Sequence, residues 1–167
     1  TSSKYSLIVN NIKLSDLSTV QSTYAPSQVT IVDTAANIVS NITTLNSLAS
    51  SGKLGSIQIS DNNPLLLTDT QITTNTALWK ANWIGNADIK GTNIKIASIT
   101  LLQSIIPLGS NLSLLSATVL DTSALVANNL NQLSSDAPNS LEALVSTGLV
   151  SSITLSDTTP LVITTRD

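Results

Sequence analysis

Four aspartates end short β-branched or alternating runs and recur at matching places in the chain: Asp33, Asp61, Asp121 and Asp157. A row of carboxylates suggests calcium binding, but a calcium site needs several oxygens that converge within one loop. No segment combines alternating Asp and Asn with a fixed Gly. Aspartate also accepts the free amides of a first helical turn and initiates turns. We therefore predict helix caps and turns at these positions, with weak calcium ligation as the alternative.

Two tryptophans, Trp79 and Trp83, lie four residues apart with Lys80 between them. Exposed indoles combine a large apolar face with a polar N–H group and suit the stacking of sugar rings. Both are therefore candidate carbohydrate-binding residues. A spacing of four on a helix also places two side chains on one face, where both would pack into the core. We favour burial and keep the sugar site as an alternative.

The chain lacks the residues on which most catalytic mechanisms depend. It has no His and no Cys, and Glu142 is its single glutamate. A nucleophilic triad needs a base, and a glycosidase needs two carboxylates at a set separation, to which nothing here points. Neither Lys53 nor Lys95 belongs to a Ser-x-x-Lys motif. We predict that the protein is not an enzyme and has no catalytic residue.

Composition narrows the class of protein further. The 167 residues are 41% hydrophobic and carry a net charge of −3, with no Phe and only two Tyr and two Trp. A chain of this size and hydrophobicity folds as one domain with an aliphatic core. Scattered Lys and Arg residues give no basic stripe for nucleic acid. No apolar run approaches the ~20 residues of a membrane span. The distribution of basic residues therefore excludes nucleic-acid binding, and the length of the apolar runs excludes a membrane span.

The chain contains an internal sequence repeat of two copies. Tyr5–Leu45 aligns without a gap on Asn93–Leu133, and Leu48–Gln71 aligns on Leu144–Asp167. The second block contains ten identities in 24 positions. An insertion near 134–140 separates the two blocks in the second copy. We expect a single repeat-containing domain over 1–167, with copy one at about 5–92 and copy two, truncated, at about 93–167. The chain is expected to be a segment of a longer array.

Each copy predicts short strands joined by helices. Strands are expected at residues 5–9, 29–32, 56–61 and 65–67, and again at 94–99, 152–157 and 161–163, each from an apolar or alternating run. Helical spacing follows Asp33 and Asp121, with Gly52 as a helix stop, and a further helix is expected over 72–83. Crossovers between short strands favour parallel pairing. The predicted fold is α/β, a solenoid-like or elongated layered architecture of short, mainly parallel strands with flanking helices; a compact α/β sandwich is the alternative.

One segment of the first copy resembles a known repeat. It runs from Val29 through Asp33-Thr34-Ala35-Ala36-Asn37-Ile38 to Gly52-Lys53 and Ile57-Gln58-Ile59-Ser60-Asp61. This pattern is similar to the Asp-Thr-Ala-Ala-Asn-Ile repeats of very large proteobacterial exoproteins, some of which resemble adhesins and type I secretion substrates. The second copy departs from the pattern at Ser123, Leu125 and the insertion. The resemblance implies an extracellular or cell-surface location in a Gram-negative bacterium, and it brings no catalytic residue.

We therefore expect a structural or adhesive repeat module of a large bacterial cell-surface or secreted protein, which extends or presents other domains. Its expected partners are neighbouring repeats of the same chain, and surface glycans or other copies of itself are further candidates. One alternative is a carbohydrate-binding module that uses Trp79 and Trp83. Another is a self-assembling surface-layer segment, either with or without a dependence on calcium. No cofactor is required by the first of these functions.

Overall fold

The strands form two four-stranded sheets in which every described pair is parallel. The computed structural model describes residues 6–131 and 140–163. The first sheet has the order β1 (Ile8–Ile12), β2 (Gln28–Asp33), β3 (Leu54–Ile59) and β5 (Trp83–Ile84). The second has the order β4 (Leu65–Thr68), β6 (Ala87–Ile94), β7 (Leu112–Asp121) and β8 (Val150–Leu155). The predicted α/β class with parallel strands is confirmed.

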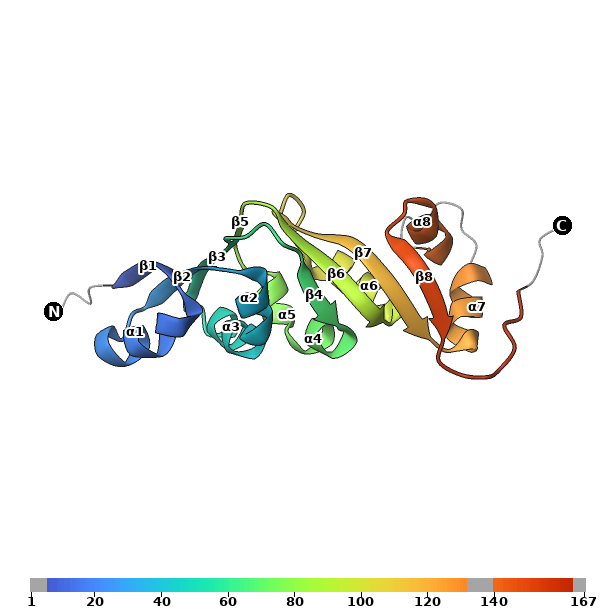
Figure 1. Cartoon of the computed structure of the whole chain (residues 1–167), viewed down its shortest axis with the longest axis horizontal. Helices are drawn as coiled ribbons and strands as arrows, with labels where there is room; N and C mark the ends of the chain where they lie inside the picture. Colours follow the sequence, from blue (N-terminus) through green and yellow to red (C-terminus); the bar gives the residue numbers. More distant parts are fainter. Residues whose placement is uncertain (1–5, 132–139, 164–167) are drawn as a thin grey trace.

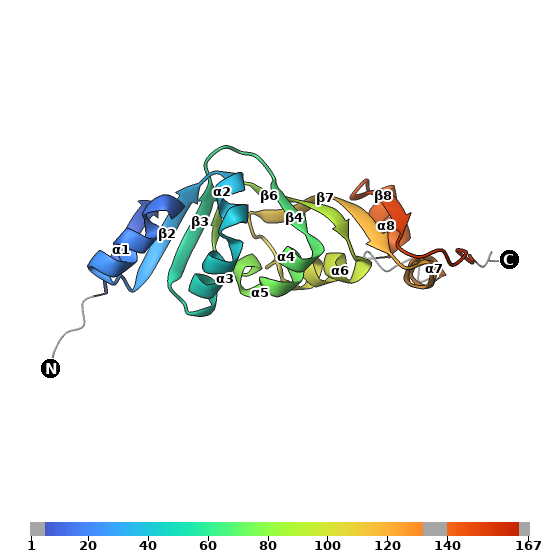
Figure 2. The same cartoon turned by 60° about the horizontal axis from the view of Figure 1, so that its bottom comes forward.

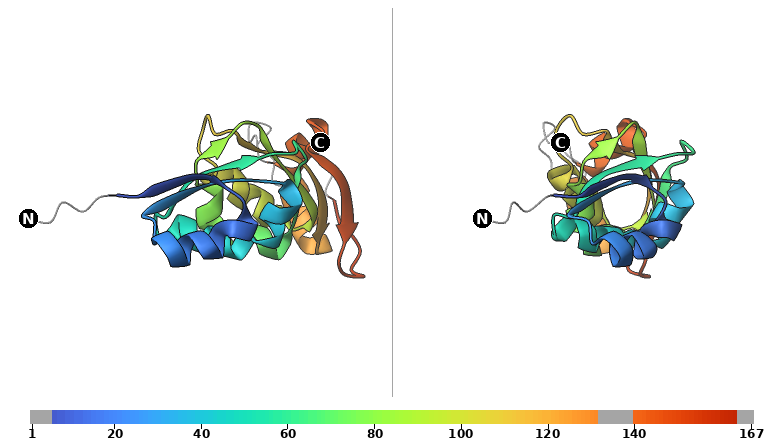
Figure 3. Two further views of the ribbon diagram at one scale, coloured as in Figure 1. Left: turned by 60° about the vertical axis from the view of Figure 1, so that its left-hand side comes forward. Right: turned by 90° about the vertical axis from the view of Figure 1, so that its left-hand side faces the viewer.

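Helices connect the strands and flank both sheets. They are η1 (Leu14–Asp16), α1 (Leu17–Tyr24), α2 (Ala35–Ser40), α3 (Ile42–Ser50), α4 (Asp69–Thr74), α5 (Thr76–Trp79), α6 (Ile96–Ile105), α7 (Ser123–Asn131) and α8 (Leu141–Ser146). The molecule is elongated, with β1 near one end and β8 near the other (Figure 1). Figure 2 shows α3, α5, α4 and α6 following one another along one side of the strands. Seen along the long axis, helices and strands surround a common interior (Figure 3).

One face of each sheet carries the core. In β2 the alternate residues Val29, Ile31 and Asp33 are buried, and the residues between them are only partly buried. In β7 the same alternation buries Ala117 and Val119. A strand with period-two burial covers its apolar face and leaves the other face toward solvent. The flanking helices therefore bury a single face, and the interior is mainly Ile, Leu and Val.

The two sheets have matching registers in their central pairs. The matching pairs are Val29–Leu54 and Ala117–Val150, Ile31–Ile57 and Val119–Ile153, and Asp33–Ile59 and Asp121–Leu155. A register shift follows the first pair in both sheets, between Val29 and Thr30 and between Ala117 and Thr118. Residues of β2 match residues of β7 that lie 88 positions later, and residues of β3 match residues of β8 that lie 96 positions later. These are the two offsets of the sequence alignment.

The first strands of the two sequence halves, β1 and β6, correspond at a different offset from the one that the sequence alignment predicts. The matching pairs are Ile8–Gln28 and Lys90–Ser116, Val9–Val29 and Gly91–Ala117, and Ile12–Ile31 and Ile94–Val119. β1 thus matches β6 at an offset of 82, so the gapless alignment of Tyr5–Leu45 on Asn93–Leu133 is wrong over its first part. Residues 96–105 form helix α6, so the strand expected at 94–99 is wrong beyond Ile94. The physical reason is a longer connection between helix and second strand in the second half.

Two further expectations are corrected, and one lies partly outside the described residues. The helix expected over 72–83 is divided into α4, α5 and the short strand β5. Residues 161–163 do not form a strand. The insertion near 134–140 falls almost entirely outside the described ranges, and helix α8 follows it. Gly52 ends α3 with a φ of 70°, a left-handed conformation that glycine adopts at little cost.

Candidate functional site

The aspartate at the end of β2 is a buried hydrogen-bond acceptor. Asp33 is 6% exposed. Its Oδ2 accepts the backbone N–H of Leu14 at 2.8 Å, and its Oδ1 accepts the N–H of Thr34 at 2.8 Å and Nδ2 of Asn37 at 2.7 Å. Leu14 begins η1, the helical turn that follows the neighbouring strand β1. The Asp33 carboxylate therefore joins the end of β2 to the segment that leaves β1.

Asp61 plays the corresponding role one strand further along. It follows β3, and its Oδ1 accepts the backbone N–H of Ala35 at 3.1 Å, which is the first residue of α2. Asn63 donates to the same carboxylate through its backbone N–H at 3.3 Å and its Nδ2 at 2.9 Å. Asp61 thus closes a turn and satisfies an amide at the start of the helix that follows β2.

The second sheet repeats both arrangements. Oδ2 of Asp121 accepts the backbone N–H of Ile96, the first residue of α6, at 3.1 Å. Oδ1 of Asp157 accepts the N–H of Ser123, the first residue of α7, at 3.1 Å. Each carboxylate after a strand therefore caps the helix that follows the neighbouring strand.

A fifth carboxylate joins this series from the other side of β6. Oδ1 of Asp69, at the start of α4, accepts the backbone N–H of Lys95 at 2.8 Å and the hydroxyl of Ser98 at 2.6 Å. Lys95 is the residue that precedes α6. The helix that follows β6 is therefore held by carboxylates from both of its neighbours in the sheet. A negative charge at a helix N-terminus is also favoured by the helix dipole.

The predicted capping role is right in kind but wrong in its assignment. The residue at the N-cap of α2 is Thr34, whose hydroxyl accepts the N–H of Asn37 at 3.2 Å. Asp33 instead caps the preceding helical segment across the sheet. A carboxylate at the end of a strand lies beside the helix start of the adjacent strand as well as its own, and the sequence cannot distinguish the two.

Hydrogen bonding determines how two of these carboxyls ionise. Burial raises the pKa of Asp33, but the hydrogen bonds from the Asn37 side chain and from the amides of Leu14 and Thr34 outweigh it, so this pKa lies below its usual value. The side chain of Asn63 and the amide of Ala35 lower the pKa of Asp61. Both groups are therefore held as carboxylates at neutral pH.

The aspartates do not assemble into a metal cage. Among residues 6–131 and 140–163, no group of three or more His, Cys, Asp or Glu side chains is arranged to hold a metal ion. Asp33 and Asp61 approach the same helix start, where they bind the consecutive amides of Thr34 and Ala35. Their closest donors are thus backbone and amide N–H groups, which are the partners of a cap.

Both tryptophans are core residues, which confirms the burial that the sequence analysis favours, and the alternative of a sugar-stacking site is wrong. Trp79 is 0% exposed and Trp83 is 2% exposed. Nε1 of Trp79 donates to the carbonyl of Ile72 at 2.8 Å, and Nε1 of Trp83 donates to the carbonyl of Leu78 at 3.1 Å. The two residues belong to α5 and β5, so they do not share one helix face. Neither indole offers a face to a ligand.

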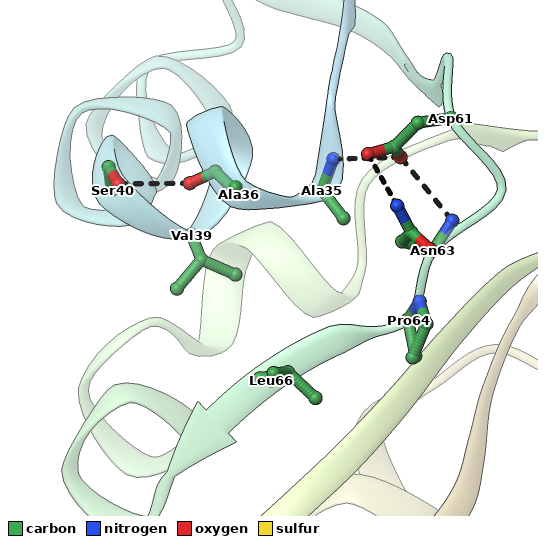
Figure 4. A pocket seen from close by; sticks show the side chains of 8 residues that line it. All are labelled: Ala35, Ala36, Val39, Ser40, Asp61, Asn63, Pro64 and Leu66. Carbon is green, nitrogen blue, oxygen red and sulfur yellow. Dashed lines mark hydrogen bonds between the residues drawn. The ribbon is translucent and has the colours of Figure 1, made fainter.

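One hollow of about 500 Å³ lies beside Asp61, between α2 and β4. Its walls are largely apolar, and it is lined by Ala35, Ala36, Val39, Ser40, Asp61, Asn63, Pro64 and Leu66 (Figure 4). Figure 4 shows the Asp61 carboxylate directed to Ala35 and Asn63, and the Ser40 hydroxyl directed to the carbonyl of Ala36. The lining contains no histidine, cysteine or lysine, so it has no general base or activated nucleophile beyond an ionised carboxylate already in use.

No family model, no curated protein and no solved structure matches this chain. Among the described helices, none has the length and hydrophobicity that crossing a bilayer requires. Function must therefore be inferred from the geometry of this chain.

Sequence reasoning missed two sets of polar residues. At the offset of 96, Asp69 matches Thr165, which is not acidic, so recurrence did not single it out. Asn11 and Asn93 have φ values of 55° and 51°, and their backbone N–H groups donate to the hydroxyls of Thr30 at 2.7 Å and Thr118 at 2.8 Å. The signal for these asparagines was the repeated triplet Asn-Ile-Lys at residues 11–13 and 93–95.

Proposed function

We propose that this chain is a structural repeat module, a segment of an elongated α/β array that extends or presents other domains of a large bacterial cell-surface or secreted protein. The observation that supports it best is the use made of its aspartates. In α/β proteins, ligands bind beyond the carboxyl ends of parallel strands. Here carboxylates at those ends, including Asp33, Asp61, Asp121 and Asp157, accept backbone amides of adjacent helix starts.

Agreement between the two sheets supports a repeat architecture. The strand registers, the register shifts and the cross-strand caps recur with the same partners. In this proposal the second unit begins with β6 at Ala87 rather than at 93. The elements succeed one another along the long axis, as expected when each unit contacts mainly its neighbours (Figure 1).

Small-angle scattering tests the shape on which the proposal rests. A compact domain of this length has a radius of gyration of about 15 Å. We expect a clearly larger value at the limit of low concentration, with a separate and smaller cross-sectional radius. A single radius near the compact value would contradict the proposed extended module.

Location is tested separately from shape. Antibodies raised against this chain should label intact source cells or their culture medium, since the proposal places the module outside the cell. Labelling that appears only after the cells are permeabilised would contradict the surface or secreted location and leave the scattering result untouched.

A self-assembling surface-layer segment remains the second candidate function. The observation in its favour is the outer edge of β1, beside which no strand lies among residues 6–131 and 140–163. An uncovered edge strand is a template for pairing with another chain. This candidate function does not require calcium, because the carboxylates of Asp33 and Asp61 already accept backbone N–H groups.

A further inference from the structure

The hollow beside Asp61 combines apolar walls with one charged group. Its apolar walls include Ala36 and Val39 of α2, together with Pro64 and Leu66 on the side of β4 (Figure 4). Leu66 is 61% exposed, so this wall is open to solvent. Among the described residues that line the hollow, Asp61 alone carries a charge. A volume of about 500 Å³ lies within the range of pockets that hold small groups.

The hollow lies inside the molecule's length, at the junction of its two halves. One wall is α2, which follows β2 of the first sheet, and the other is β4, which pairs with β6 of the second half. Both halves that could cover the hollow are therefore already in place. A further unit of an array would lie beside β1 or β8, and α2 and β4 lie between these two strands (Figure 1).

The Asp61 carboxylate is held in one orientation and keeps part of its hydrogen-bonding capacity. Its Oδ1 accepts the N–H of Ala35 at 3.1 Å and the N–H of Asn63 at 3.3 Å, while Oδ2 accepts Nδ2 of Asn63 at 2.9 Å. A carboxylate oxygen has about two acceptor positions, so among the described contacts Oδ2 keeps one. Because Asp61 is exposed, a donor from solvent can reach this position.

This single acceptor position discriminates among cations. A guanidinium group binds a carboxylate best through two parallel N–H···O bonds, one to each oxygen, and Oδ1 already has two donors. A quaternary ammonium group is recognised by aromatic faces, and none of the described lining residues is aromatic. A primary ammonium group on an aliphatic stem needs one acceptor and an apolar surface for its methylenes.

We propose that the hollow binds a lysine side chain of a partner protein, whose ammonium group donates to Oδ2 of Asp61 while its methylenes lie between Val39 and Leu66. The net charge of −3 favours a partner with a basic surface at longer range. A single side chain supplies one contact of such an interface. The inference goes beyond the proposed structural role, which requires no ligand, and it does not depend on that role.

Titration of the full chain with Nα-acetyl-lysine N-methylamide, followed through NMR spectra of the backbone amides, tests the site at low salt. The amides of Ala35, Ala36 and Asn63 should shift together and saturate, with a dissociation constant on the order of 10 mM, because an exposed ion pair with a short apolar stem is weak. The norleucine and arginine derivatives should bind at least about threefold more weakly. Equal affinity for the lysine and norleucine derivatives would overturn the proposal.

Two substitutions test the charge and the wall separately. Asp61→Asn should weaken binding of the lysine derivative about fivefold, since the ion pair is lost. Leu66→Ala should weaken it about threefold, since less of the stem is covered, and it should leave the melting temperature nearly unchanged because Leu66 is exposed. Leu66→Ala and the comparison of derivatives test the site even where Asp61→Asn fails to fold.

The matched control is Asp16→Asn, at an exposed carboxylate outside the hollow, and it should leave the affinity unchanged. Wild-type affinity in a folded Asp61→Asn chain would contradict the role of the carboxylate. Wild-type affinity in Leu66→Ala would contradict the placement of the stem. Either result would reject the proposed site.

A second ligand distinguishes a lysine side chain from a free alkylamine. n-Hexylamine has an ammonium group on an aliphatic stem and no peptide groups. Shifts of the same amides with both ligands would support the lysine site. Shifts with n-hexylamine alone would overturn the assignment to a partner protein in favour of a small amine, and no shift with either ligand would remove the site altogether. None of these outcomes changes what the scattering and labelling experiments report.

Discussion

Replacing Asp33 by asparagine should destabilise the fold far more than the same change at an exposed aspartate. The Asp33 carboxylate accepts three N–H donors, from Leu14, Thr34 and Asn37, at 2.7–2.8 Å. An asparagine offers one acceptor oxygen, and its NH₂ group faces at least one of these donors. A hydrogen bond to a charged group contributes about 1.5–3 kcal/mol. We therefore expect Asp33→Asn to lower the free energy of unfolding by about 3 kcal/mol.

Urea denaturation followed by tryptophan fluorescence measures this loss, because Trp79 and Trp83 are buried in the native protein. With an m-value of about 2 kcal/mol/M, the midpoint should fall by about 1.5 M. Asp16→Asn is the matched control, since the Asp16 carboxylate is exposed and, among the described residues, accepts a side-chain hydrogen bond only from the neighbouring Ser15 hydroxyl, at 3.1 Å. The free energy of unfolding of this control should change by less than about 0.5 kcal/mol. Equal shifts for the two variants would refute the structural role of Asp33.

The same pair of proteins gives a pH test. The pKa of Asp33 is lowered in the folded state, so ionised Asp33 contributes stability that is fully present above the unfolded value of about 3.9. That contribution is lost as the pH falls through the folded pKa. The stability gap between wild type and Asp33→Asn should therefore be constant near neutrality and narrow below about pH 4. A gap that widens on acidification would contradict the assigned hydrogen bonds.

Three other perturbations follow from the same geometry. Trp79→Phe removes the donor to the Ile72 carbonyl and should lower the free energy of unfolding by about 3 kcal/mol in urea denaturation. In the wild type, no sugar should change the tryptophan emission. Gly91→Ala would place a Cβ 2.6 Å from Cδ1 of Ile94, so it should lower the free energy of unfolding by about 1 kcal/mol. Ile94→Val removes Cδ1 and should relieve part of that loss. An equal loss with Ile94 and with Val at this position would contradict the clash. Calcium and EDTA should give the same melting temperature, because Asp33 and Asp61 are committed to N–H donors; a calcium-dependent rise would show that these carboxylates bind the ion.

Local features of the chain were predictable because they depend on short-range chemistry. The β-branched run at Val29–Val32 lies in β2, the alternating run at 56–61 forms a strand as far as Ile59, and Gly52 follows the end of a helix. Parallel pairing followed from the crossovers between strands. Each of these depends on spacing or on a backbone conformation that a single residue type favours.

Longer-range features were not predictable from one sequence. The offset of the opening strands was wrong, because a chain rich in Ser, Thr, Leu and Ile gives plausible matches at more than one offset. The triplet Asn11-Ile12-Lys13, with its counterpart at 93–95, carried the correct offset, since its asparagines adopt a left-handed conformation at a register shift.

The candidate site shows the same limit. Recurrence identified Asp33, Asp61, Asp121 and Asp157 as structural residues, but which helix each one caps depends on strand neighbours. Asp69 was missed because it has no acidic counterpart. The spacing of Trp79 and Trp83 suggested one helix face, whereas a turn between α5 and β5 separates them and both enter the core.

Scattering from a tandem of two copies, with Asp167 joined directly to Thr1, tests the proposed extended module most directly. A compact body that doubles its length in residues gains only about 30% in radius of gyration. An elongated array should come close to doubling this radius while its cross-sectional radius stays constant. A gain near the compact value would contradict the proposal that this chain builds an extended module.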